Sequence, residues 1–131
     1  MRLLIVEDHL ITSQLMKGIL SEYGECEVAY NGKEAVEVFK KNMMTEGKLF
    51  DVIFLDILMP EMDGHQALEQ IRQIESDYGI EGLQCVKIIM TTAKDDKETI
   101  INSFKYQCDG YVVKPISKEI IKNKLVELKV I

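Results

Sequence analysis

Short apolar runs alternate along the chain with longer segments whose apolar residues recur every three to four positions. The runs, which we interpret as strands, cover residues 3–6, 25–30, 52–55, 86–90 and 111–113. Most of them are apolar at nearly every position, a pattern typical of parallel strands that are covered on both faces. The second run is weaker, since polar residues interrupt it.

Apolar stripes at helical spacing predict five helices between and after these strands. The stripes assigned to the core are Ile11, Leu15 and Ile19; Ala35, Val38 and Phe39; Ala67, Leu68, Ile71 and Ile74; Ile100, Ile101 and Phe104; and Ile121, Leu125 and Leu128. Gly24 is predicted to end the first helix, Asn31-Gly32 and Asp63-Gly64 to be turns that open the second and third, and Ser117 to cap the last. Residues 75–84, which contain Gly79 and Gly82, are predicted to form an irregular surface loop.

Strands that alternate with helices predict an α/β fold, a doubly wound five-stranded parallel sheet with five helices. The length of 131 residues is typical of one domain, and we expect residues 1–131 to form a single unit, without a linker or an internal repeat.

Composition and charge narrow the function. The formal net charge is −6, which argues against nucleic acid as a direct partner. Cys26, Cys85 and Cys108 are far apart and form no C-x-x-C pair, so we expect reduced thiols rather than disulfides or a zinc site. No secretory signal is visible, and no run approaches the ~20 apolar residues that cross a bilayer, so we expect a cytoplasmic protein that is not inserted in a membrane.

Polar side chains follow four of the predicted strands. Glu7-Asp8, Asp56, Thr91-Thr92 and Lys114-Pro115 come directly after them. Taken singly, each is an ordinary solvated loop residue. In an open parallel sheet, however, the carboxyl ends of the strands lie along one edge, and ligands bind there. Together the four strand ends therefore predict one site with three carboxylates, a hydroxyl and an ammonium.

Clustered carboxylates repel one another and favour a bound cation, and Mg²⁺ prefers such hard oxygen ligands. Asp56 is then placed as a carboxylate nucleophile that forms an aspartyl-phosphate. Lys114 and Mg²⁺ would neutralise charge on the transferring group, and the Thr92 hydroxyl would donate a hydrogen bond to it. The sequence has no Gly-rich phosphate-binding loop, so tight nucleotide binding is not indicated.

At these residues the chain resembles the receiver domain of two-component response regulators, of the chemotaxis-Y-like kind known from bacterial signalling. The resemblance rests on residues 3–8, 51–56, 59–64, 90–93 and 110–115. It implies a flavodoxin-like three-layer sandwich and a phosphorelay protein that is not an enzyme but assists its own phosphorylation and dephosphorylation. Because the sequence stops after the fifth helix, we expect a stand-alone receiver without an output domain.

The resemblance also implies a role for each site residue. These are Asp56 as the phosphoacceptor and a Mg²⁺ ligand, Asp8 as a direct ligand, Glu7 as a ligand through water, the backbone carbonyl of Leu58 as a further ligand, Thr92 and Lys114 as contacts of the phosphoryl group, and Tyr111 with Thr92 as the switch. The donor would be the phosphohistidine of a sensor histidine kinase or a histidine phosphotransfer protein, or a small acyl phosphate. The downstream protein target is unknown.

The sequence departs from the family pattern at three site positions and in the connection over residues 75–84, which is longer than usual. Glu7 replaces the commoner Asp, Leu58 stands where some relatives carry Asn, and Lys94 lies two residues after Thr92. The last two flank the route of the hydrolytic water in the family, so they bear on the lifetime of the phosphoryl group. His9 and His65 lack partners at metal-binding spacing. His9 lies beside the acidic pair, where it either tunes the site or is an ordinary loop residue.

Two other functions compete with phosphorelay. A phosphatase of the haloacid dehalogenase type also uses a nucleophilic Asp after a buried strand, but it needs a second Asp two residues later as acid and base. Leu58 occupies that position. The other alternative is a receiver-like binding module that takes no phosphate, against which the complete set of Asp8, Asp56, Thr92 and Lys114 argues.

Overall fold

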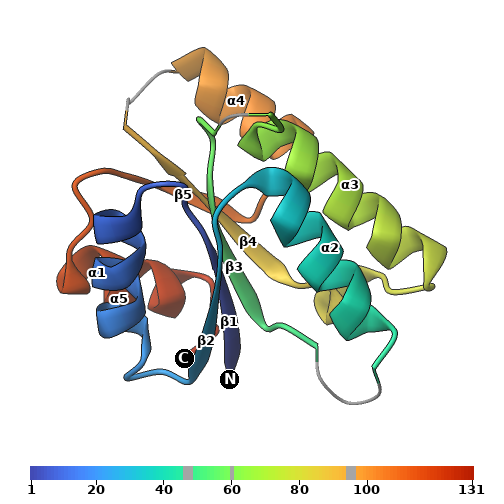
Figure 1. Cartoon of the computed structure of the whole chain (residues 1–131), viewed down its shortest axis with the longest axis horizontal. Coiled ribbons are helices and arrows are strands. Elements are labelled where there is room, and N and C mark those ends of the chain that lie inside the picture. Colours follow the sequence, from blue (N-terminus) through green and yellow to red (C-terminus); the bar gives the residue numbers. More distant parts are fainter. Residues whose placement is uncertain (46–48, 60, 94–96) are drawn as a thin grey trace.

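Strands and helices alternate throughout the computed structural model, which describes residues 1–45, 49–59, 61–93 and 97–131. In chain order the elements are β1 (Arg2–Val6), α1 (Leu10–Leu20), β2 (Glu25–Ala29), α2 (Gly32–Met43), β3 (Val52–Asp56), α3 (Gly64–Asp77), the short 3₁₀ turn η1 (Gly82–Gln84), β4 (Lys87–Thr92), α4 (Lys97–Lys105), β5 (Gly110–Val113) and α5 (Lys118–Glu127) (Figure 1).

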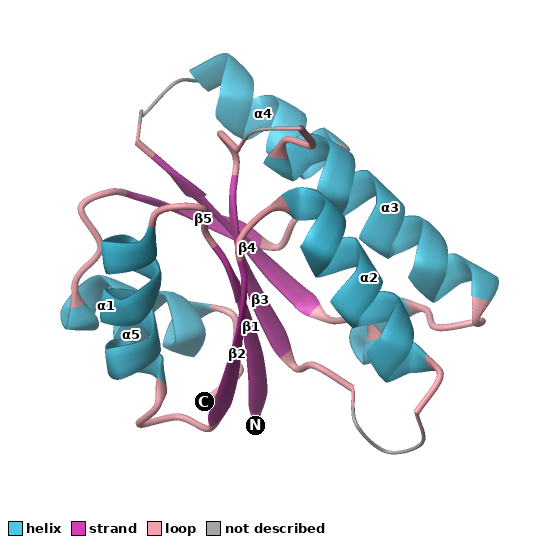
Figure 2. Ribbon diagram, viewed as in Figure 1, coloured by secondary structure: helices cyan, strands magenta, loops and turns pink. Residues whose placement is uncertain are grey.

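The five strands form one parallel sheet in the order β2-β1-β3-β4-β5. Helices α1 and α5 cover one face, and α2, α3 and α4 lie on the other (Figure 2). The order reverses at β1, because the chain first moves outward to β2 and then returns across β1 to β3. This confirms the predicted doubly wound, flavodoxin-like sandwich, and it places the carboxyl ends of β1 and β3 at the switch point where ligands bind.

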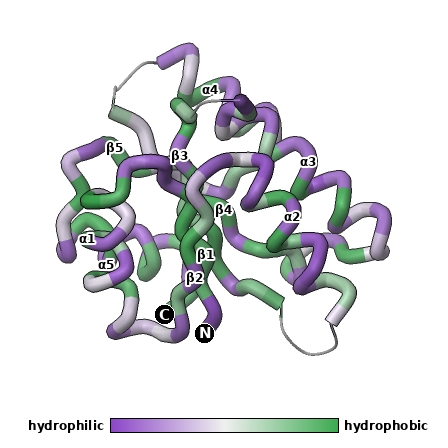
Figure 3. Tube along the Cα trace, viewed as in Figure 1, coloured by the Kyte–Doolittle hydropathy of each residue, from purple (hydrophilic) through white to green (hydrophobic). Residues whose placement is uncertain are grey.

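The core has two layers, one on each side of the sheet. Successive residues of β1 alternate between them: Leu3 and Ile5 pack with α1 and α5, whereas Leu4 and Val6 pack with α2 and α3. Because both faces are covered, the central strands are apolar along most of their length, and Figure 3 shows this concentration of hydrophobic residues in the sheet.

The stripe predicted for the first helix is wrong at two positions. Ile11 and Leu15 are 74% and 54% exposed, and α1 instead buries Ser13, Met16 and Leu20. The helix carries apolar residues on several sides, so periodicity alone does not select the face that meets the sheet. A buried serine is tolerated because its hydroxyl donates to the carbonyl of Leu10 at 2.7 Å.

The stripe predicted for the fourth helix is wrong in the same way. Ile101 and Phe104 are 56% and 47% exposed, and Ser103 is the residue of α4 that is buried. The stripes of α2, α3 and α5 are confirmed, since each buries at least two of its predicted core residues.

Helix ends agree with the sequence in most places. Ser117 caps α5 as predicted, through a side-chain oxygen that accepts a backbone hydrogen bond. Asn31 and Asp63, which were predicted as turn residues, cap α2 and α3 in the same way. Gly24 does not end the first helix, which stops at Leu20. Instead, Gly24 lies against the backbone of Met1, where no β-carbon fits.

The loop predicted for residues 75–84 begins later than expected, because α3 continues through Asp77. Glu75 is buried in the helix, where it accepts hydrogen bonds from Arg72 Nη1 at 2.6 Å and from the amide of Val86 at 2.7 Å. These two hydrogen bonds satisfy the buried carboxylate of Glu75. In the sequence Glu75 is one polar residue among several, and nothing local marks it as buried.

Candidate functional site

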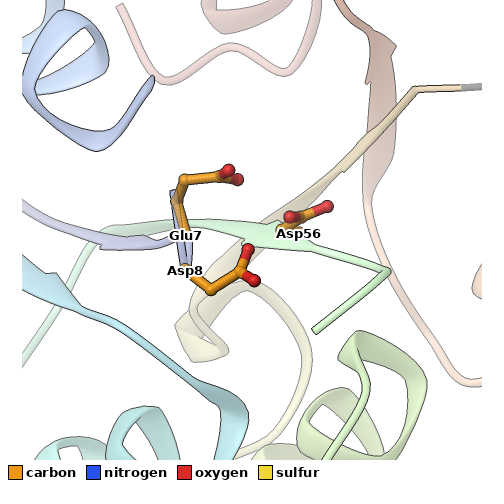
Figure 4. Close-up of side chains that lie close together, drawn as sticks. All are labelled: Glu7, Asp8 and Asp56. Atoms are coloured by element: carbon orange, nitrogen blue, oxygen red, sulfur yellow. The ribbon is translucent and has the colours of Figure 1, made fainter. Parts of the chain in front are cut away.

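The strand ends bring three carboxylates together, as the sequence predicts. Glu7 and Asp8 follow β1, and Asp56 is the last residue of β3. One oxygen from each side chain lies within 4.8 Å of the others, and Figure 4 shows the three carboxylates grouped at the ends of the two strands. Glu7 and Asp56 are buried, whereas Asp8 is exposed.

Backbone hydrogen bonds extend the sheet to this rim and fix its geometry. The amide of Glu7 donates to the carbonyl of Ala29 at 3.0 Å, which ties the end of β1 to β2. On the other side, the amide of Ile57 donates to the carbonyl of Thr91 at 3.1 Å, and that of Lys114 to the carbonyl of Thr92 at 2.7 Å. The functional side chains therefore project from a rigid edge rather than from free loops.

A close backbone approach holds α3 against the loop that follows Asp56. The amide of Gly64 donates to the carbonyl of Ile57 at 2.8 Å. A β-carbon at position 64 would overlap the carbonyl oxygen of Asp56 and lie 2.7 Å from the Cα of Ile57. Asp63 closes the turn, because its Oδ1 accepts from the amide of Gln66 at 2.9 Å while its own amide donates to Gln66 Oε1. Asp63 and Gly64 thus form the predicted turn.

Lys114 reaches the carboxylates from the end of β5 and pairs chiefly with Glu7. Its Nζ lies 3.0 Å from Glu7 Oε2 and 3.3 Å from Oε1, and 3.4 Å from Asp56 Oδ2. Burial lowers the pKa of Lys114, but the hydrogen bond from Lys114 to Glu7 and the negative charges of Asp56 and Glu7 outweigh it, so the pKa is raised. Lys114 is therefore a firmly held cation.

The excess of negative charge on the rim favours a bound metal ion. Burial, together with the hydrogen bond and the negative charge of Glu7, raises the pKa of Asp56 to about 7 against the lowering effect of Lys114. Among the described residues of the cluster, one ammonium faces three carboxylates. A divalent cation that prefers hard oxygen ligands would relieve the remaining repulsion, and the donor set fits Mg²⁺.

Leu58 and Thr92 complete the rim, and Tyr111 lies away from it. Leu58 is 68% exposed and lines a cavity of 320 Å³ together with Asp8, Asp56 and Lys114. Thr92, the last residue of β4, is buried. The ring of Tyr111 packs between α4 and α5, edge-on to Phe104 with 6.2 Å between ring centroids. Lys124 Nζ lies 5.6 Å from the centroid of the same ring.

Comparison with known proteins decides the family. A family model described as the response regulator receiver domain matches residues 3–126. The chemotaxis protein CheY of Bacillus subtilis is 32% identical over 120 residues, which are 90% of this chain and 88% of that protein. This chain belongs to the response regulator receiver family.

Other relatives carry the receiver within longer proteins. The hybrid signal transduction histidine kinase L of Dictyostelium discoideum is 38% identical over 127 residues. That match covers 92% of this receiver but 7% of the kinase, and for a probable histidine kinase 2 of Oryza sativa the chain spans 12% of the relative's length.

Solved structures agree with the fold of this receiver. The receiver domain of the histidine kinase CKI1 from Arabidopsis thaliana, complexed with Mg²⁺ and BeF₃⁻, superposes with a TM-score of 0.82 at 29% identity, covering 99% of this chain and 90% of that one. A co-crystal structure of the Saccharomyces cerevisiae phosphotransfer protein Ypd1 and the receiver domain of Ssk1 gives a TM-score of 0.84 at 29% identity, covering 98% and 88%.

Two residues of the receiver's rim were missed or undervalued in the sequence. His9 precedes α1, and its Nδ1 lies 3.3 Å from Thr12 Oγ1; both line the cavity beside Asp56. Their three-residue spacing across a helix start is the signal that predicts such a contact. Lys94, which the family resemblance places beside the route of the hydrolytic water, lies outside the described residues. No described helix has the length and apolar character needed to span a bilayer.

Proposed function

We propose that this receiver accepts a phosphoryl group on Asp56, with Mg²⁺ held at the carboxylate rim, and signals by a change of shape. The observation that carries the proposal is the cavity in which the carboxylates of Glu7, Asp8 and Asp56 meet the ammonium of Lys114. In the transfer, a carboxylate oxygen of Asp56 forms a bond to phosphorus as the phosphorus–nitrogen bond of phosphohistidine breaks, and the imidazole leaves with that electron pair.

Asp8 and Asp56 would hold Mg²⁺ directly, Glu7 through water, and the backbone carbonyl of Leu58 would be a further ligand. When bound, the ion would neutralise negative charge on the oxygens of the transferring phosphoryl group. Lys114 provides a second positive charge, since its Nζ already lies 3.4 Å from Asp56 Oδ2. Thr92 would donate its hydroxyl proton to a phosphoryl oxygen.

The phosphoryl donor is proposed to be a protein with a phosphohistidine, either a sensor histidine kinase or a histidine phosphotransfer protein. The donor imidazole has to reach Asp56, so the donor must cover the rim. Large apolar side chains are exposed beside it, on the first turns of α1 and in the loop after β3: Leu10, Ile11, Leu15 and Leu58. The solved complex of Ypd1 with a receiver at 29% identity supports this class of partner.

The output is proposed to be a rearrangement that a downstream protein recognises. Phosphorylation adds about −1.5 to −2 charges at the strand ends. Thr92 would move toward a phosphoryl oxygen, and Tyr111 would turn into the space that is vacated, which changes the surface of α4, β5 and α5. We place this activity in the cytoplasm, where the three free thiols would stay reduced.

This role is that of a phosphoacceptor, not of an enzyme that turns over a small substrate. Leu58 is two residues after Asp56, where a phosphatase of the haloacid dehalogenase type needs an acid and base. An alkyl side chain provides neither, and phosphate release from a small phosphoester would contradict the proposal.

Intact mass spectrometry tests the assignment. With Mg²⁺ and a small acyl phosphate, the wild type should gain the mass of one phosphoryl group, and Asp56→Asn should gain none. Asp77→Asn, at the exposed end of α3, is the matched control and should be labelled like the wild type. Label that persists in Asp56→Asn would refute the assignment. A wild type that binds Mg²⁺ but takes no label would favour the binding-module alternative.

A further inference from the structure

The buried residue of helix α4 is polar. Ser103 is fully buried, whereas Ile101 and Phe104 on the same helix are about half exposed. Apolar burial, which stabilises most amphipathic helices, therefore contributes little to the docking of α4. The hydrogen bonds of Ser103 therefore contribute a larger part of the free energy that holds α4 in place.

The partner of Ser103 is His65 on α3, and the direction of the hydrogen bonds follows from the geometry. Ser103 Oγ donates to the carbonyl of Thr99 at 2.9 Å, which uses its only proton. His65 Nε2 lies 2.8 Å from the same Oγ, so Nε2 carries a hydrogen and donates it. The imidazole ring also contacts Tyr106, with 5.7 Å between ring centroids. One side chain of α3 thus contacts the last turn of α4 and the residue just after the helix.

His65 is linked closely to the phosphoacceptor. It follows Gly64, whose amide is bonded to the carbonyl of Ile57 and whose Cα lies against the carbonyl of Asp56. A displacement of the loop after Asp56 therefore moves the first turn of α3, and with it His65. A cavity of 410 Å³ lies between the loop after Asp56 and α4. Leu58, His65 and Thr92 line it, together with Asn102 of α4.

The segment that follows α4 is also bonded to α3. The carbonyl of Gln107 accepts from Arg72 Nε at 2.9 Å, and the amide of Cys108 donates to the carbonyl of Ser103 at 3.1 Å. Arg72 is itself paired with Asp109 at 2.8 Å. The His65 contact and this anchor both hold the last turn of α4, so loss of the His65 contact would loosen the packing of the helix on α3.

We propose that the hydrogen bond from His65 to Ser103 is a latch that holds α4 against α3 in the unphosphorylated receiver. The latch rests on the proposed function at Asp56 and adds a path through α3 to the one through Thr92 and Tyr111. Two arrangements of α4 then differ in whether this hydrogen bond is made. Phosphorylation shifts the equilibrium between them to the extent that it moves the loop on which His65 depends.

Two substitutions break the latch from opposite sides. Ser103→Ala removes the acceptor and suits a helix interior, so the fold should persist. His65→Phe keeps an aromatic ring against Tyr106 but has no hydrogen to donate. The matched control is Ser13→Ala, since Ser13 is also a buried helical serine, yet its hydroxyl bonds only to Leu10 of its own helix.

Hydrogen exchange of the α4 amides in the unphosphorylated protein is the first readout. Ser103→Ala and His65→Phe should each speed exchange on the order of fivefold, the effect of losing one hydrogen bond, and Ser13→Ala should leave α4 unchanged. The double variant should exchange no faster than either single variant, because both remove the same contact. Unchanged α4 exchange in both single variants, or additive effects in the double variant, would overturn the latch.

The second readout connects the latch to the site. Amide NMR shifts are recorded with and without Mg²⁺ and beryllofluoride, a phosphoryl mimic. In Ser103→Ala, the α4 signals of the unliganded protein should lie part-way along the line from the free to the mimic-bound wild type. Shifts off that line would overturn the latch. A wild type that does not respond to the mimic at all contradicts the proposed function instead, and the exchange measurement separates the two failures.

Discussion

Gly64 allows α3 to pack directly on the phosphoacceptor loop, and Gly64→Ala tests how much the site depends on this contact. The added β-carbon would overlap the carbonyl oxygen of Asp56 and lie 2.7 Å from the Cα of Ile57 and 3.0 Å from the carbonyl carbon of Asp56. All three neighbours are backbone atoms of a buried strand end, so no side chain can rotate away. The start of α3 must separate from the loop.

The expected cost is that of overpacking a closely packed site, roughly 1–3 kcal/mol in the free energy of unfolding. Gly18→Ala is the matched control, since Gly18 lies in α1 and a β-carbon there meets nothing within 4 Å. Alanine should stabilise that helix by about 0.5–1 kcal/mol. The two identical substitutions should therefore change stability in opposite directions.

Urea denaturation measures both variants, and labelling by a small acyl phosphate with Mg²⁺ reports the effect on the site. We expect Gly64→Ala to unfold at lower urea and to be labelled more slowly under conditions where it is fully folded, because Asp56 is displaced with its loop. Gly18→Ala should be labelled like the wild type. If Gly64→Ala were as stable as Gly18→Ala, the close approach of α3 to the loop would not constrain residue 64, and the expected loss of unfolding free energy would be refuted.

Three further predictions follow from the site and the core. Asp8→Ala should weaken Mg²⁺ binding strongly in a calorimetric titration while raising the melting temperature of the metal-free protein, because it removes one of three repelling carboxylates; equal Mg²⁺ affinity would contradict the ligand role. Leu58→Asn should shorten the lifetime of the phosphoryl group in a timed decay, since an amide can hydrogen-bond the attacking water that an exposed alkyl group cannot; an unchanged or slower decay would argue against this. Cys108 is buried, and burial raises its pKa to about 11, so in the folded protein at pH 8 it should be alkylated on the order of a hundredfold more slowly than an ordinary thiol. Mass mapping checks that rate, and alkylation as fast as in the urea-unfolded chain would refute it.

Local patterns in the sequence determined the architecture and the location of the site. Apolar runs such as residues 52–55 are strands because both faces of the sheet are covered, and their order with the helices permits few topologies. Asp56 could be assigned to the rim from the same pattern, since it is the first polar residue after such a run. The cap at Ser117 and the turn at Asn31-Gly32 were predicted because turns and caps are decided within three or four residues.

Tertiary structure decided which side chains pair and which helix faces are buried. Helix α1 is apolar on several sides, so only its docking on the sheet distinguishes buried Met16 from exposed Ile11. Lys114 pairs with Glu7 across 107 positions, although β3 and β4 lie between their strands, because the carboxyl ends of all the strands line one edge of the sheet. Periodicity and turn chemistry are local, whereas such contacts depend on how separate elements pack, and that information is spread over the whole chain.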